Sequence, residues 1–174
     1  MQPEIAIHPA NRSDYAAIAQ LQADSWASSY RCFLPPAYIR ERMHADIADS
    51  WQRHKIDKRD LVLQARLVAT GELVGFISLL CRPLPFIDKL HCAPSFTGLG
   101  IGARLLYCSF SELVKRGENT ASLTVIVGNE GARRFYLRHG AHLAGKQREL
   151  LNGYPVEVEV MEWSALNATK WHFE

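Results

Sequence analysis

The sequence has few of the features that mark secreted, membrane-bound or nucleic-acid-binding proteins. Its four cysteines match no metal or redox spacing, so we expect free, buried thiols. A net charge of +2 is too small to indicate binding to nucleic acid or to a membrane surface. No apolar run approaches the length of a membrane span, and the first residues do not resemble a secretory signal. We therefore expect a cytoplasmic protein that uses no metal and binds neither nucleic acid nor membrane.

The rest of the composition is that of an ordinary globular domain. Hydrophobic residues make up 48% of the 174 residues and charged residues 22%, which is enough for one domain with a sizeable core. Periodicity and turn residues predict strands and helices along the whole chain. Outside the central region these are a strand at 4–8, helices at 15–28 and from 37 towards 43, and hairpins of 61–68 with 73–80 and of 142–151 with 155–163. The polar stretch 45–58 is compatible with a third short helix.

A glycine-dense turn joins a predicted strand to a predicted helix in the middle of the chain. The apolar strand runs from Ile87 to Cys92, glycines stand at positions 98, 100 and 102, and helical periodicity follows to residue 115. Glycine permits positive φ and lets a ligand approach the backbone closely. Because the free N–H groups at the start of a helix attract anions, the turn predicts a phosphate site that needs no cationic side chain.

Other interpretations of the glycines are open at this point. One is a tight connection that binds no ligand. Another is dinucleotide binding, since Gly98-x-Gly100-x-x-Ala103 satisfies the loose pattern and Glu118 lies at a plausible distance for a ribose contact. That motif normally opens a doubly wound domain, whereas here it lies in mid-chain. A P-loop is excluded, because no Lys-Ser/Thr pair follows the glycines.

A second motif follows the next predicted strand, at 123–127. Residues 94–106 read P-x-x-x-G-x-G-I-G-x-x-L-L, and residues 129–140 read N-x-x-A-x-x-F-Y-x-x-x-G. In their order and separation the two motifs resemble the signatures of the GNAT acetyltransferase superfamily. The resemblance is sharp from Phe86 to Ala141 and compatible in pattern over the remainder.

The resemblance implies a fold and an activity. The fold would be α/β, with a mixed central sheet of about seven strands, a splayed parallel central pair, and helices on both faces. One domain would span 1–174, with a cofactor-binding core at about 86–141 and acceptor-binding elements at about 13–58 and 142–163. The activity would be acetyl-CoA-dependent N-acetyl transfer to an amine by direct attack in a ternary complex. The alternative is a domain of the same fold that binds acyl-CoA without transferring the acyl group.

The resemblance also implies where acetyl-CoA would lie. The pyrophosphate would meet the backbone amides of the glycine turn, and the pantetheine arm would pair with the central strand. Thr97 stands where the family usually has Arg or Gln, which predicts weaker phosphate binding. The implied cofactor-binding residues are Leu90, His91, Cys92, Gly98, Leu99, Gly100, Ile101, Gly102, Ala103, Asn129 and Tyr136.

Two residues are predicted to act in catalysis. By resemblance, the hydroxyl of Tyr136 points at the cofactor sulfur and protonates the leaving thiolate. Asp88 is the carboxylate on the central strand and is our candidate for the base, whereas some family members carry a glutamate where Phe86 or Thr124 stands here. His91 alternates to the opposite face from Asp88, so we do not expect the two to act together.

The acceptor pocket is predicted to lie between the first helices and the last hairpin. Trp26, Tyr30 and Phe33 are candidates for one wall, and Tyr154 for the other. The sequence leaves open whether the amine belongs to a small molecule or to a protein. We expect a monomer or a homodimer.

Overall fold

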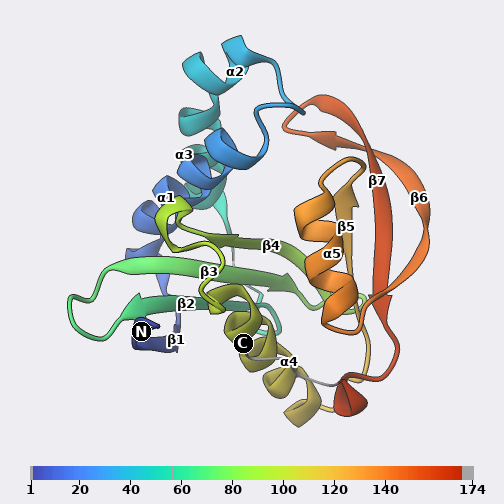
Figure 1. Cartoon of the computed structure of the whole chain (residues 1–174). Helices are drawn as coiled ribbons and strands as arrows, with labels where there is room; N and C mark the ends of the chain where they lie inside the picture. The colour runs from blue at the N-terminus through green and yellow to red at the C-terminus, as the bar shows by residue number, and fades with distance from the viewer. Residues whose placement is uncertain (1, 56, 170–174) are drawn as a thin grey trace.

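A mixed sheet of seven strands forms the frame of the molecule, in the order β1-β2-β3-β4-β5-β7-β6 (Figure 1). The computed structural model describes residues 2–55 and 57–169. Neighbouring strands are antiparallel except for β4 and β5, which are parallel. The strands are β1 Ile5–Pro9, β2 Leu61–Leu67, β3 Leu73–Leu80, β4 Phe86–Cys92, β5 Ala121–Ile126, β6 His142–Leu151 and β7 Tyr154–Trp163.

Helices cover both faces of this sheet, as predicted. They are α1 Tyr15–Ser29, α2 Pro36–Glu41, α3 Met43–Arg53, α4 Ile101–Lys115 and α5 Glu130–Arg138. One apolar core, which includes Phe110 and Trp163, packs α4 and α5 against the sheet. A second core, which includes Trp51 and Phe76, packs α1 and α3 against the other face. The β4–α4–β5 crossover is the predicted parallel unit, and the fold class is confirmed.

The last hairpin shows how local sequence sets register. Asn152 has φ 47° and Gly153 has φ 89°, which are the left-handed conformations that a type I′ turn needs. Because this turn allows only two residues between the strands, Leu151 pairs with Tyr154 and Glu149 pairs with Val156. The predicted hairpin is therefore confirmed.

The parallel strands β4 and β5 are paired at one position only. Phe86 pairs with Ser122, and the Ser122 N–H donates to the Pro85 carbonyl at 3.1 Å. Beyond that pair, β5 is hydrogen-bonded to β7 and β4 is hydrogen-bonded to β3. The peptide groups of β4 that face β5 therefore have no ladder partner among the described residues, and the predicted splayed pair is confirmed.

A β-bulge interrupts the pairing of β3 and β4 at Asp88. Ser78 lies opposite Lys89 and Leu79 opposite Ile87, so Asp88 is the extra residue. A bulge breaks the strict alternation of side chains. The Asp88 carboxylate accordingly pairs with the Lys89 ammonium, which lies 5.5 Å above the Trp51 ring, on the face that carries α3.

The expectation that Asp88 and His91 lie on opposite faces is thereby corrected. His91 contacts α1 on this same face, so the bulge brings both side chains to the side of α1 and α3. Period-two reasoning fails here because it assumes an unbroken ladder.

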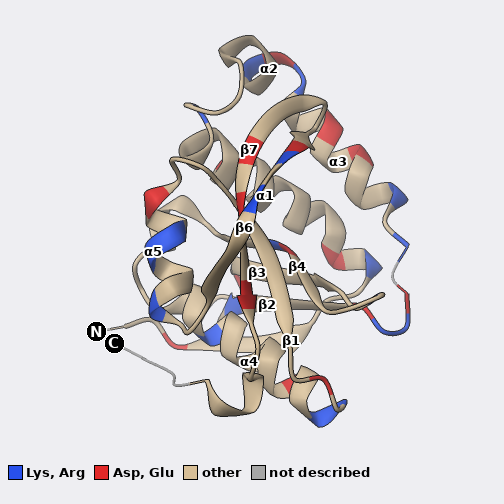
Figure 2. Cartoon of the chain, turned by 90° about the vertical axis from the view of Figure 1, so that its right-hand side faces the viewer, with Lys and Arg blue, Asp and Glu red and all other residues tan. Residues whose placement is uncertain are grey.

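Surface features agree with the composition. No helix in the described part of the chain is both long and apolar enough to cross a membrane. Basic and acidic residues are interspersed along the elements in Figure 2. All four cysteines are free, but Cys32, between α1 and α2, is exposed, which corrects the expectation that the thiols are buried.

Candidate functional site

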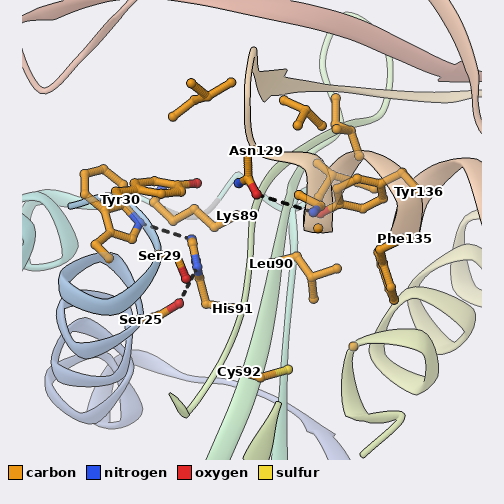
Figure 3. A pocket seen from close by; sticks show the side chains of 18 of the residues that line it. Ser25, Ser29, Tyr30, Lys89, Leu90, His91, Cys92, Asn129, Phe135 and Tyr136 are labelled. Carbon is orange, nitrogen blue, oxygen red and sulfur yellow. Dashed lines mark hydrogen bonds between the residues drawn. The ribbon is translucent and has the colours of Figure 1, made fainter. Parts of the chain in front are cut away.

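A cavity of about 860 Å³ lies where β4 and β5 part (Figure 3). Its lining comes from α1, α3, β4, the start of α4, β5, α5 and the β6–β7 hairpin. The glycine turn forms one end, and Asp88, Lys89 and Glu149 line another part. Residues separated by more than 100 positions thus meet around a gap that the sheet itself creates.

The glycine turn, which the sequence predicts to bind phosphate, opens into this cavity. Gly98 and Gly100 both have φ 76°, a left-handed conformation that favours glycine. The first helical bond of α4 runs from the Arg104 N–H to the Gly100 carbonyl at 3.1 Å, and the N-cap residue, Gly100, makes no side-chain capping bond. The N–H groups of the first turn therefore have no intrahelical partner, and they fit an anionic phosphate.

Side chains add little positive charge around the turn. The Thr97 hydroxyl donates to the Pro94 carbonyl at 3.1 Å and so stabilises the turn itself. Arg104 donates to the Ile5 carbonyl and Arg133 pairs with Glu159, so both are engaged elsewhere. Arg138 of α5 does line the cavity.

The open edge of β4 borders the cavity next to the turn. Leu90 points towards α5 and His91 towards α1 (Figure 3), and both line the cavity together with Cys92. The unpaired peptide groups of this edge fit an arm that carries amides of its own, such as pantetheine. Leu99 lies outside the cavity lining and packs against the core under α4.

His91 is held in a single protonation state by α1. The Trp26 indole N–H donates to His91 Nε2 at 3.2 Å, and Ser25 Oγ lies 3.0 Å from His91 Nδ1. An indole can only donate, so Nε2 accepts, and Nδ1 carries the hydrogen that is donated to Ser25. Burial, with a smaller effect of Lys89, lowers the pKa of His91 to about 3. His91 is therefore neutral and joins α1 to β4.

The second motif places Asn129 and Tyr136 at the cavity. Asn129 begins α5, and its Oδ1 accepts the Ala132 N–H at 3.4 Å. Tyr136 is 9% exposed. Its pKa is raised, first by burial and then by Tyr30 and Cys92, so the hydroxyl keeps its proton. A protonated phenol beside the open edge of β4 is able to donate to a thiolate.

The predicted acceptor wall is only partly brought to the cavity. Trp26 and Tyr30 line it, with ring centroids 5.0 Å apart, and burial raises the pKa of Tyr30 to about 12. The ring centroid of Phe33 lies 6.3 Å from that of Tyr30, and the ring centroid of Tyr154 lies 4.8 Å from that of Tyr38. Neither Phe33 nor Tyr154 is among the described residues that line the cavity.

Sequence reasoning missed Glu149 of β6. Its Oε2 accepts from the Thr124 hydroxyl at 3.1 Å, and its Oε1 from the Gln147 amide at 2.9 Å. A glutamate from β6 thus reaches Thr124 of β5. The signal was present in the hairpin, because the register of the type I′ turn puts residues 149 and 151 on one face. Over the described residues no group of three or more His, Cys, Asp or Glu side chains forms a metal site.

Comparison with known proteins assigns the family. The model of the acetyltransferase (GNAT) family matches residues 21–141, which is more than half of the chain. This chain belongs to the GNAT family. The two motifs recognised in the sequence lie within the matched region.

Two relatives show how similar this GNAT chain is in sequence to known proteins. The dTDP-fucosamine acetyltransferase of Escherichia coli is 28% identical over 137 residues, which cover 77% of this chain and 57% of the relative. An uncharacterized N-acetyltransferase of Archaeoglobus fulgidus is 31% identical over 121 residues, covering 64% of this chain and 78% of the relative. The chain thus spans little more than half the length of the fucosamine enzyme.

Solved structures share the GNAT fold. A GCN5-related N-acetyltransferase from Rhodopseudomonas palustris superposes with a TM-score of 0.76 at 21% identity, covering 94% of this chain and 98% of that one. The PaiA N-acetyltransferase of Thermoplasma acidophilum, in complex with coenzyme A, superposes with a TM-score of 0.69 at 22% identity, covering 92% of this chain and 99% of that one.

Proposed function

We propose that this chain is an acetyl-CoA-dependent N-acetyltransferase. The observation that carries the proposal is the continuous cavity that joins the uncapped start of α4 to the parting of β4 and β5. This cavity offers a phosphate site, an open strand edge and a protonated tyrosine in sequence. The thioester supplies an activated acetyl group, and membership of the GNAT family supports the assignment.

In this proposal different residues of the cavity bind the cofactor and donate the proton. The amides of residues 98–103 hold the pyrophosphate, and the edge of β4 from Leu90 to Cys92 aligns the pantetheine arm. Asn129 fixes the start of α5, and Tyr136 donates a proton to the leaving thiolate. Orientation of the two substrates is the largest contribution to rate, since direct attack mainly requires alignment.

The acceptor is an amine, and the protein acts in the cytoplasm. A fucosamine enzyme among the relatives and spermidine N-acetyltransferases among the structural neighbours act on amines of metabolites. Trp26 and Tyr30 provide an aromatic wall against which a small molecule would pack. We therefore favour a small-molecule amine over a protein amine.

Release of free CoA thiol tests the transferase. The protein is incubated with acetyl-CoA and a panel of amines, and thiol is measured against a reaction without amine. Amine-dependent release is expected for at least one member, together with the acetylated product by mass spectrometry. Acetyl-CoA binding without release for any amine would contradict transfer.

One observation favours an acyl-CoA-binding module as the second candidate. The Thr97 side chain bonds within its own turn, where the family usually has a cationic or amide side chain. Such a module would bind acetyl-CoA and acetylate none of the panel. The presence of both Tyr136 and Asn129 at the cavity supports the enzyme instead.

A further inference from the structure

Glu149 presents a carboxylate just inside the opening of the sheet. Thr124, to which it is bonded, lies two residues beyond Ser122, the last residue of β5 that pairs with β4. The side chain is partly buried and lines the cavity. Two hydrogen bonds, from Thr124 and Gln147, hold its two oxygens in place. A carboxylate has about four acceptor sites, so capacity remains for a ligand.

The charge of Glu149 is not neutralised by the protein. Among the ion pairs between described residues, none includes Glu149. The other charged groups in the described lining of the cavity are Asp88 and Lys89 of β4 and Arg138 of α5, and Tyr30 of α1 and Tyr136 and His139 of α5 are titratable there as well. The lining residues of β5, β7 and α3 are uncharged: Leu123, Thr124, Val125, Ile126, Val156, Val158, Ile47 and Ser50.

Asp88 differs from Glu149 in this respect. Its carboxylate is paired with the Lys89 ammonium, so the pair has no net charge. A cation that enters the cavity therefore meets one uncompensated carboxylate. Attraction between opposite charges is strengthened in a partly buried site, where water screens less.

We propose that Glu149 binds the ammonium group of the acceptor and accepts its proton before transfer. This inference rests on the proposed transferase function and names the acceptor class, a primary amine that is cationic at neutral pH. Thr124 is then a positioning residue, because its hydroxyl orients the carboxylate without contacting the acceptor.

The ammonium loses one proton to Glu149, and the freed nitrogen pair attacks the carbonyl carbon of the thioester. The carbon–nitrogen bond forms, the carbon–sulfur bond breaks, and the thiolate takes a proton from Tyr136, which regains one from the acylated nitrogen. The products are an amide, a thiol and one proton, which Glu149 releases to solvent.

The first experiment probes the cation site without knowledge of the acceptor. Two thioethers of CoA are compared by calorimetry, one with a 3-aminopropyl group on sulfur and one with the isosteric butyl group. The wild type is expected to bind the ammonium form about tenfold more tightly. Glu149→Gln is expected to remove this preference and leave the affinity for the butyl form unchanged. Glu157→Gln, an exposed neighbour on β7, is expected to keep it.

The outcomes separate the two proposals. Failure of the wild type to bind either thioether would overturn cofactor binding and the proposed function. Equal binding of both thioethers by the wild type, or a preference that is kept in Glu149→Gln, would overturn the role of Glu149 alone.

Kinetics with an active amine test the proton transfer. Glu149→Gln is expected to lower kcat/KM by about 100-fold at pH 7, and by progressively less as the pH approaches the pKa of the amine. Thr124→Val is expected to lower kcat by a few-fold, with the same pH trend. A loss in Glu149→Gln that is the same at every pH would show that the carboxylate binds without accepting a proton, and would overturn that step.

Discussion

Tyr136 keeps its proton because everything around its hydroxyl disfavours the phenolate. Burial has the largest effect, and the neighbouring Tyr30 and Cys92 act in the same direction. An acid that is rarely ionised still protonates a thiolate efficiently when the two atoms are held together. The tyrosine is thus suited to donate and unsuited to act as a base.

Tyr136→Phe is expected to lower kcat by about 10- to 1000-fold while the affinity for acetyl-CoA changes by no more than a few-fold. Steady-state kinetics and calorimetry measure the two effects. Tyr107→Phe, on the exposed side of α4, serves as the matched control and should turn over like the wild type. Unchanged turnover in Tyr136→Phe would show that the ring only packs.

Among the elements, the turn before α4 places a left-handed backbone at the cavity. Gly100 has φ 76° and lies at the cavity, whereas Gly71 has φ 73° and lies in the β2–β3 turn. An added Cβ strains both positions alike, by about 1–2 kcal/mol. A matched pair of substitutions therefore separates backbone strain from ligand binding.

The pair predicts different losses. Gly100→Ala and Gly71→Ala should lower the free energy of unfolding by similar amounts, as measured with urea. Only Gly100→Ala should weaken acetyl-CoA binding, by about tenfold or more, since its methyl group meets the approaching phosphates. Equal acetyl-CoA affinity in the two variants would refute the phosphate site at this turn.

How far the sequence predicts an element depends on the range of the interactions that form it. The glycine turn, the type I′ hairpin and the motif around Tyr136 are set by residues close in sequence, and they were predicted. The β-bulge at Asp88 depends on how β3 pairs with β4, which period-two patterns do not reveal. Thr124 lies on β5 and Glu149 on the edge strand β6, and β7 lies between these two strands in the sheet. Their hydrogen bond therefore follows only from the three-dimensional fold.

For the whole molecule, a neutral, partly buried histidine makes stability depend on pH. The pKa of His91 is about 3 in the folded state and about 6.5 when unfolded, so the unfolded chain binds more protons between these values. The stabilisation is complete above pH 6.5 and is lost as the pH falls towards 3. Burial also lowers the pKa of His54, which acts in the same direction.

Urea unfolding at several pH values measures this linkage. The free energy of unfolding is expected to fall by up to about 1.4 kcal/mol per pH unit for each proton below pH 6.5. The amide of His91→Gln is able to bond to both Ser25 and Trp26. In this variant the free energy of unfolding should depend less steeply on pH, by an amount that corresponds to the uptake of up to one proton on unfolding. An identical slope in the variant would mean that His91 is charged in the folded protein.

The single β4–β5 pair has a consequence for solubility. An unpaired strand edge is normally a hazard, because another chain can add to it and start aggregation. The parting of the sheet gives this molecule two further edges besides those of β1 and β6, but the new edges face each other across the cavity. Residues of α1 and α5 line the same cavity, where a ligand arm fits and an incoming strand meets helices first. The fold thus keeps free peptide groups for recognition at positions that are shielded from another chain.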